Sequence, residues 1–303
     1  MGCFMKEFYI YSSLDNKKLC CIDFSENLKN PKIVLQICHG MAEHIRRYKD
    51  FALFLEKQGI RVFGMDNRGH GKTCEAEEEK GYIADKEGNI KLIEDVYDLN
   101  KYIKEQFPNK KVVIFGHSMG SLIAMKWVIE NNYKYFILSG FPLQKKLSVF
   151  LGKMLTGMEK LLFFKKKSFM NKEFKKYNDN FKPNLTKFDW LTRDENEVKK
   201  YEESEFCGYP ISPGVFNGIV GMMGFINRNY KKVRNDANML VIYGTEDKAM
   251  DIEYVNKMLE TLKKKKRRIN VLENKKGRHE SLNEINKYEI YDEILKWLNE
   301  REK

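Results

Sequence analysis

The stretch of sequence most suggestive of chemistry is Gly116-His117-Ser118-Met119-Gly120, which matches the pattern G-x-S-x-G. It follows a short apolar run, Lys111–Phe115, that is typical of a buried strand, and it precedes a segment that predicts a helix to about Asn131. A serine between a strand and a helix lies in a sharp turn that raises its hydroxyl above the sheet. The helix N-terminus also favours negative charge that develops nearby. Ser118 is therefore predicted to be a nucleophile.

A serine hydroxyl reacts poorly unless a neighbouring base takes its proton and a third group orients that base. Where the nucleophile sits in such a turn, the partners follow it in the order acid, then histidine. Only one of the five histidines, His279, lies after Ser118, in a polar loop behind the strand-like run Arg268–Leu272. His279 is therefore predicted to be the base.

The acid should follow the strand that precedes the histidine loop, the apolar run Asn238–Tyr243. Asp247 is best placed, just beyond the end of this strand, while Glu246 and Asp251 are alternatives that could equally be solvated or cap a helix. Such an acid holds the imidazole in the correct tautomer and stabilises its protonated form.

An acyl-transfer reaction at Ser118 also needs N–H groups that stabilise an oxyanion. One should be the backbone N–H of Met119, the residue after the nucleophile. The other should come from the loop 39–44, which follows the apolar run Ile33–Cys38, and we assign it to Met41. The sequence thus predicts an oxyanion hole built from two backbone groups.

These loops are expected at one edge of a sheet, because strand and helix signals alternate along most of the chain. Predicted strands are Glu7–Tyr11, Leu19–Phe24, Ile33–Cys38, Ile60–Met65, Lys111–Phe115, Tyr135–Leu138, Asn238–Tyr243 and Arg268–Leu272. Predicted helices are Arg46–Gln58, Ile90–Phe107, Ser118–Asn131, Ile252–Leu262 and Glu284–Asn299. The first two strands look like an antiparallel hairpin. The remainder predicts an α/β fold with a mainly parallel, doubly wound sheet, whose ligands meet the carboxyl ends of the strands.

The alternation fails in residues 141–233, which read as a helical lid inserted between two late strands of a core formed by residues 1–140 and 234–303. One apolar stripe runs through 147–164. Its members are Leu147, Phe150, Leu151, Met154, Leu155, Met158, Leu161 and Leu162. By default this stripe packs between lid and body; above a nucleophile it could instead line an acyl-chain tunnel. Its candidate substrate-binding residues are Leu151, Met154, Leu155 and Met158.

The composition, 42% apolar and 32% charged, is that of an ordinary globular protein. The net charge of +12 suggests either a solvated lysine-rich surface, which we favour, or transient contact of a basic lid with a membrane surface. No nucleic-acid module accompanies the runs Lys165–Lys167 and Lys263–Arg268, so no nucleic-acid partner is predicted.

The six cysteines form no C-x-x-C motif, and the first residues, Met1–Phe8, do not resemble a secretory signal. These two features predict a cytoplasmic location.

Two other motifs lead to different chemistry but are incomplete. The segment Gly69–Thr73 resembles the end of a phosphate-binding loop, yet Asp66 stands where that pattern requires glycine. His39, Glu43 and His44 have no further ligand set, so no metal site is predicted. Structural or oxyanion-loop roles are expected for them.

With these residues identified, the chain resembles the monoacylglycerol lipase and lysophospholipase branch of the α/β-hydrolases, which includes serine aminopeptidase S33-type hydrolases. The motifs that carry the resemblance are His39-Gly40-Met41-Ala42-Glu43-His44, Asp66-Asn67-Arg68-Gly69-His70-Gly71, Gly116-His117-Ser118-Met119-Gly120, the loops around Asp247 and His279, and, in the lid, Arg193-Asp194-Glu195 and Cys207-Gly208-Tyr209. The resemblance implies a triad of Ser118, Asp247 and His279, an oxyanion hole from Met41 and Met119, and no cofactor.

The expected function is hydrolysis of carboxylic esters of single-acyl lipids, monoacylglycerol or lysophospholipid, through an acyl-enzyme. An esterase or amidase for small non-lipid substrates is the first alternative. An acyltransferase and a non-catalytic membrane-surface binding protein are the others, and the complete triad argues against the last of these.

Overall fold

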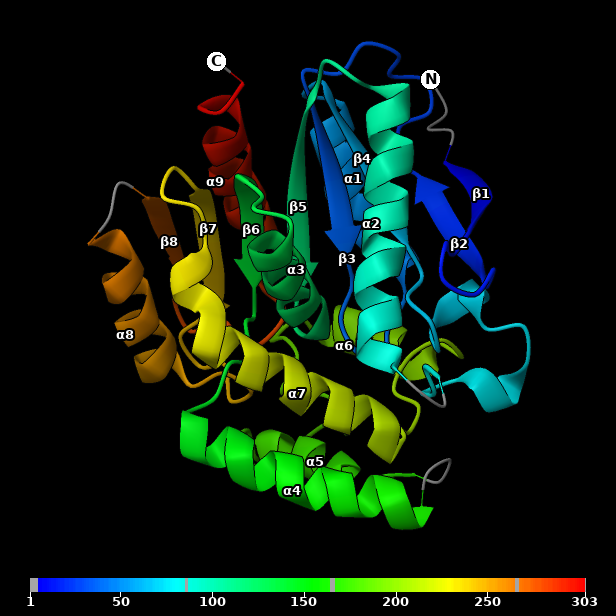
Figure 1. Ribbon diagram of the computed structural model, residues 1–303. Helices are drawn as coiled ribbons and strands as arrows, with labels where there is room; N and C mark the ends of the chain where they lie inside the picture. Colours follow the sequence, from blue (N-terminus) through cyan, green and yellow to red (C-terminus); the bar gives the residue numbers. More distant parts are fainter. Residues whose placement is uncertain (1–4, 85–86, 164–166, 265–266, 303) are drawn as a thin grey trace.

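A computed structural model describes residues 5–84, 87–163, 167–264 and 267–302. Figure 1 shows a central sheet whose strands follow the order β1-β2-β4-β3-β5-β6-β7-β8. The strands are β1 Lys6–Tyr11, β2 Lys18–Asp23, β3 Ile33–Cys38, β4 Ile60–Met65, β5 Lys111–His117, β6 Tyr135–Ser139, β7 Asn238–Gly244 and β8 Arg268–Asn274. The pairs β1–β2 and β2–β4 are antiparallel and the other neighbours are parallel, which confirms the predicted hairpin and the predicted parallel sheet.

Helices cover both faces of this sheet, because the central strands are apolar on both sides. One face packs against α2 (Gly88–Gln106), α3 (Met119–Glu130) and α8 (Ile252–Lys263). The other face packs against α1 (Lys49–Glu56) and α9 (Lys287–Asn299). The doubly wound α/β prediction is confirmed.

Two predicted helices begin later than expected. The segment predicted as a helix from Arg46 starts as a 3₁₀ turn, Ile45–Tyr48, before α1. The last helix begins at Lys287 rather than Glu284, because the buried Glu284 carboxylate accepts hydrogen bonds from the backbone of Arg278 and the side chain of Arg193. Side-chain bonds that tie a segment to the rest of the fold here take precedence over helical periodicity.

The residues between β6 and β7, which we call the insertion, form four α-helices in the part that the structure describes. These are α4 (Lys146–Phe163), α5 (Lys172–Asp179), α6 (Glu195–Glu203) and α7 (Pro213–Asn229). In Figure 1, α7 lies between α4 and the helices of the sheet, so that α4 is the outermost layer. The insertion therefore covers the edge where the carboxyl ends of β5, β6 and β7 meet.

The apolar stripe of α4 faces away from the body of the protein, so the prediction that it packs between lid and body is wrong. Its exposed fractions lie between 54% for Met154 and 85% for Leu161. The opposite side of α4 supplies Gly152, which lies next to Val220 of α7, and Val149, which lies next to Gly224 of the same helix. Phe164, the last residue of the stripe segment, lies outside the described residues.

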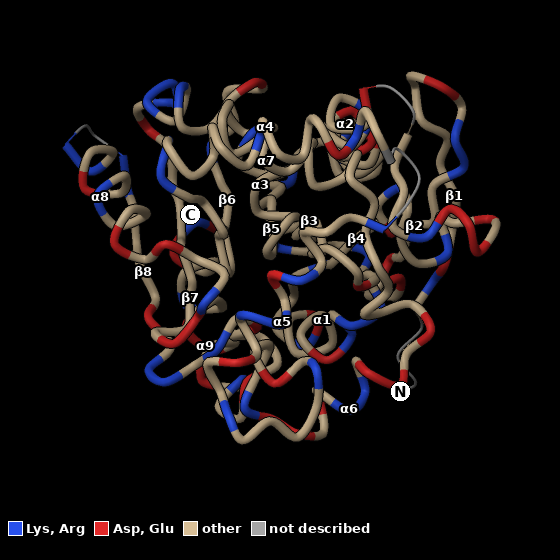
Figure 2. The backbone as a smooth tube through the Cα atoms, turned by 90° about the horizontal axis from the view of Figure 1, so that it is seen from below, with Lys and Arg blue, Asp and Glu red and all other residues tan. Residues whose placement is uncertain are grey.

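Basic and acidic residues are interspersed along the backbone, as Figure 2 shows, rather than separated into two regions. Four residues of the lysine-rich runs at 165–167 and 263–268 lie outside the described residues, namely Lys165, Lys166, Lys265 and Lys266. The described cysteines, Cys20, Cys21, Cys38, Cys74 and Cys207, form no disulfide, and Cys3 is not among them. No helix in the described part of the chain is both long and apolar enough to span a membrane.

Candidate active site

Ser118 occupies a strained turn between β5 and α3. Its backbone angles, φ 50° and ψ −119°, lie in a region that L-residues rarely adopt. The glycines on either side permit the turn: a Cβ on Gly120 would lie 2.0 Å from the carbonyl oxygen of Cys38, and one on Gly116 would lie 2.4 Å from that of Gly120. A bond from Ser118 N–H to the Ser139 carbonyl, 2.9 Å, ties the turn to β6. The backbone thus holds the hydroxyl at the edge of the sheet.

The structure brings Ser118, His279 and Asp247 together from the ends of β5, β8 and β7. The Ser118 hydroxyl lies 2.8 Å from Nε2 of His279, and the Nδ1–H of His279 donates to Oδ2 of Asp247 over 2.8 Å. Both partners are buried, which shields the two bonds from water. This is the geometry in which a serine loses its proton to an imidazole that a carboxylate orients.

Asp251, one of the two alternative acids, has a different role in the structure. Asp251 accepts a hydrogen bond from the backbone N–H of Tyr254, 3.0 Å away, and so caps α8. Asp247 is itself fixed, since its second carboxylate oxygen accepts from the Ala249 N–H at 2.8 Å. Of the three acids considered from sequence, Asp247 is therefore the one bonded to His279.

Burial and charge act in opposite directions on the imidazole of His279. Burial disfavours its protonated form, but the Asp247 carboxylate and its hydrogen bond outweigh this, and the pKa of His279 is raised above its usual value. His117, whose ring centre lies 5.0 Å from that of His279, is affected in the opposite sense: burial, together with the neighbouring imidazole, lowers its pKa to about 4. His117 therefore stays neutral beside His279.

Met41 and Met119 both line the cavity that contains Ser118, as an oxyanion hole would require. The loop that carries Met41 is held from behind, because the Gly40 N–H donates to Oε1 of Glu43 over 2.5 Å. Ala42, with φ 53°, presents its carbonyl oxygen to the Tyr201 hydroxyl at 2.8 Å. The loop is thus fixed from both sides.

A buried ion network joins this loop to the histidine loop, and sequence reasoning missed it. Arg47 donates to Oε2 of Glu43 at 2.6 Å and to both carboxylate oxygens of Glu280 at 2.7 and 2.6 Å. The Tyr48 hydroxyl donates a hydrogen bond of 2.9 Å to the other carboxylate oxygen of Glu43. Despite burial, the arginine charge lowers the pKa of Glu43 to about 2 and also lowers that of Glu280. Only the i, i+4 spacing of Glu43 and Arg47 hinted at this arrangement.

An apolar cavity of about 180 Å³ opens over Ser118. Its walls are formed mainly by α7 and the inner side of α4, with residues that include Val149, Gly152, Phe216, Ile219, Val220 and Met223. The structure does not bring the predicted substrate-binding residues to this cavity, since Leu151, Met154, Leu155 and Met158 are more than half exposed on the outer side of α4. The prediction that these four residues line an acyl-chain tunnel is therefore wrong, and other residues form the cavity over Ser118. The apolar residues at helical spacing in 215–226 could have indicated these walls from the sequence.

The two incomplete motifs have structural roles. Thr73, at the end of the segment that resembles a phosphate-binding loop, donates to the Asp66 carbonyl and accepts from the Cys20 N–H. His39 uses both ring nitrogens on backbone groups, at the Gly40 carbonyl and the Asn67 N–H. Within the described ranges, no three His, Cys, Asp or Glu side chains gather closely enough to hold a metal ion.

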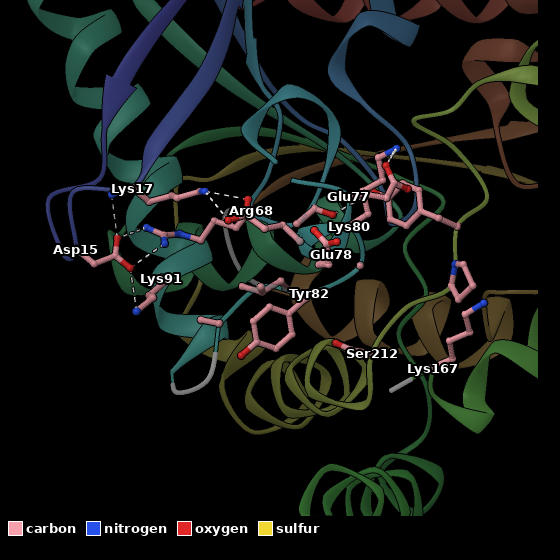
Figure 3. A pocket seen from close by; sticks show the side chains of 17 residues that line it. Asp15, Lys17, Arg68, Glu77, Glu78, Lys80, Tyr82, Lys91, Lys167 and Ser212 are labelled. Carbon is pink, nitrogen blue, oxygen red and sulfur yellow. Dashed lines mark hydrogen bonds and ion pairs between the residues drawn. The ribbon is translucent and has the colours of Figure 1, made fainter. Parts of the chain in front are cut away.

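A larger cavity, of about 930 Å³, has different walls, and Figure 3 shows the residues that line it. Its charged groups neutralise one another: Figure 3 shows Asp15 between Arg68 and Lys91, and Lys17 reaches Glu79. None of the three triad residues lines it. Size alone therefore does not make it the reactive site.

Fold and site together define an α/β-hydrolase with a Ser–His–Asp arrangement. The family model described as serine aminopeptidase, S33, matches residues 29–286, and the chain belongs to this family. A carboxyl esterase from Bacillus coagulans, solved with glycerol, superimposes with a TM-score of 0.86 over 98% of this chain and 99% of the esterase, at 23% identity. At that identity the likeness establishes the fold.

Curated relatives match over shorter segments. A monoglyceride lipase homolog of Monkeypox virus is 34% identical over 119 residues, which are 39% of this chain and 41% of the viral protein. The human monoglyceride lipase is 31% identical over 100 residues, 33% of this chain and 31% of the human one. The chain thus aligns with less than half the length of these relatives.

Proposed function

We propose that the protein hydrolyses carboxylic esters of single-acyl lipids through an acyl-enzyme on Ser118. The observation that carries the proposal is the hydrogen-bonded series Ser118–His279–Asp247 at the base of an apolar cavity. The similarity to monoglyceride lipases of a virus and of human supports an ester of this class. An apolar cavity suits a fatty acyl chain, because burying each CH₂ group contributes about 0.8 kcal/mol.

In the proposed reaction, His279 takes the proton from Ser118 as the hydroxyl oxygen attacks the ester carbonyl carbon. The negative oxygen of the tetrahedral intermediate accepts hydrogen bonds from the backbone N–H groups of Met41 and Met119. His279 then gives its proton to the leaving alcohol, and water repeats the sequence to release the fatty acid. Asp247 stabilises the protonated imidazole throughout.

We also propose that the insertion acts as a lid and that the outer side of α4 makes transient contact with membrane surfaces. The exposed stripe of leucine, methionine and phenylalanine side chains supports this, as does the exposed Lys146 at the start of the same helix. The unpaired described cysteines support a cytoplasmic location.

Hydrolysis of a p-nitrophenyl ester series from acetate to palmitate, by the native protein and by Ser118→Ala, tests the proposal. We expect turnover that rises towards medium or long chains and is abolished by the substitution. Serine-dependent turnover confined to acetate and butyrate would replace the lipid assignment with a small-ester esterase. Absence of turnover in the native protein would contradict hydrolysis altogether.

A further inference from the structure

A second cavity, of about 480 Å³, adjoins the first and belongs entirely to the insertion and the oxyanion loop. It shares two wall residues, Met41 and Phe174, with the cavity over Ser118. A substrate whose carbonyl oxygen lies at Met41 therefore has a cavity on each side of its ester bond.

The position of His279 indicates which cavity receives which half of the ester. The leaving alcohol must lie beside His279, because this residue protonates it. Trp190 lies against His279, with ring centres 5.0 Å apart, and it lines the second cavity but not the first. Phe174 stacks on Trp190 at 5.7 Å and 10°, so that the two rings form a continuous wall towards His279. The second cavity is thus on the side of the alcohol.

Polar and cationic groups distinguish this cavity from the apolar one. Lys175 of α5 and Lys187 of the following loop both line it, and neither forms an ion pair within the part of the chain that the structure describes. The acid on its wall, Asp179, is paired with Lys182 at 3.1 Å. Asp189 does not line the cavity, and its carboxylate accepts hydrogen bonds from the backbone N–H groups of residues 185 and 186 and from the Thr186 hydroxyl. The lining of the cavity therefore carries two lysines against one carboxylate, which is already paired with a third lysine.

We infer that this cavity is the subsite for an alcohol that bears a phosphate, so that the preferred substrate is a single-acyl glycerolipid with an anionic phosphate headgroup rather than a neutral monoacylglycerol. A phosphate carries one to two negative charges and several acceptor oxygens, which suit two ammonium groups that approach from separate elements. The inference rests on the proposed ester hydrolysis and specifies the substrate class of the same site.

The test compares octanoyl-glycerol with octanoyl-glycerol 3-phosphate, both kept below their micelle concentrations so that membrane contact does not contribute. We expect the native protein to have a kcat/KM about tenfold higher for the phosphate ester, mainly through KM, with the advantage falling as salt is added. The double variant Lys175→Gln, Lys187→Gln should change the ratio of the two kcat/KM values about tenfold towards the neutral ester. Lys176→Gln is the matched control, because Lys176 neighbours Lys175 but pairs with Glu173 and does not line the cavity.

Equal ratios in the native protein and the double variant would overturn the inference while leaving ester hydrolysis intact. Failure of the native protein to cleave either ester would overturn both. Glycerol 3-phosphate should inhibit the native protein competitively and more strongly than inorganic phosphate does. Equal inhibition by the two would show recognition of phosphate without the alcohol, which would also overturn the assignment.

Discussion

Replacing Arg47 by methionine should destabilise the protein far more than an ordinary loss of charge. The Arg47 side chain is 11% exposed, and those of Glu43 and Glu280 are 4% exposed each. Without the guanidinium, two buried carboxylates lose three hydrogen bonds and face each other without a cation. Breaking a buried ion pair on one side costs about 3–5 kcal/mol, so we expect a loss of this size in the free energy of unfolding at neutral pH.

The pH dependence of this loss identifies its cause. In the native protein the arginine lowers the pKa values of Glu43 and Glu280, so their stabilising contribution is present above the pKa values of the unfolded chain and is lost only in acid. In Arg47→Met, burial acts on the two carboxylates without the opposing guanidinium charge and raises their pKa values, so ionisation now opposes folding. The difference between variant and native protein should therefore be largest near pH 8 and shrink towards about pH 5.

Urea unfolding of both proteins at these two pH values measures the effect. The control is Arg234→Met, because Arg234 pairs with Asp236 on the surface, where such a pair contributes less than about 1 kcal/mol. A loss in Arg47→Met no larger than that of the control, or one that does not vary with pH, would refute the argument. Glu43 holds the oxyanion loop and Glu280 follows His279 in the chain. The kcat of Arg47→Met should therefore fall even without urea, under conditions in which the variant is folded.

Three further outcomes are expected. Asp247→Asn should lower kcat by about 10⁴ and move the acid limb of the pH–rate profile to lower pH, because the raised pKa of His279 depends on the carboxylate; an unmoved limb would contradict this role. Gly120→Ala should abolish activity and lower the unfolding temperature, since its Cβ meets a backbone oxygen at 2.0 Å; a fully active variant would show that the turn is not constrained. The double change Leu155→Ser, Met158→Ser should alter the free energy of unfolding by less than about 0.5 kcal/mol but weaken sedimentation with anionic vesicles, and unchanged vesicle binding would refute the membrane contact proposed for α4.

The sheet and the grouping of Ser118, His279 and Asp247 could be predicted because their signals are local or follow a fixed order. Ile33–Cys38 and Ile60–Met65 are apolar runs whose bounds coincide with β3 and β4, and His279 is the only histidine after the nucleophile. The end of the strand Asn238–Tyr243 favoured Asp247 as the acid but left Glu246 and Asp251 as alternatives, which the hydrogen bond to His279 decides between. Such elements can be predicted without knowing which residues distant in the sequence are in contact.

The walls of the cavity and the buried ion network could not be predicted in this way. The large apolar residues of the α4 stripe lie on its exposed side, whereas the covered side carries Val149 together with the buried polar residues Thr156 and Glu159. Which side is covered depends on α7, whose packing residues follow some seventy positions later. Arg47 and Glu280 are 233 residues apart, so their bond follows from the folded topology alone. Tertiary contacts of this kind leave no periodic trace in the sequence.

The central claim is that Ser118 is a nucleophile activated by His279, and covalent labelling tests it most directly. A fluorophosphonate should add to the native protein once per chain, and mass spectrometry of a digest should locate the adduct on Ser118. His279→Ala should react much more slowly, and turnover of p-nitrophenyl esters should be lost in proportion to labelling. A label on another residue, or full turnover by the labelled protein, would contradict the account.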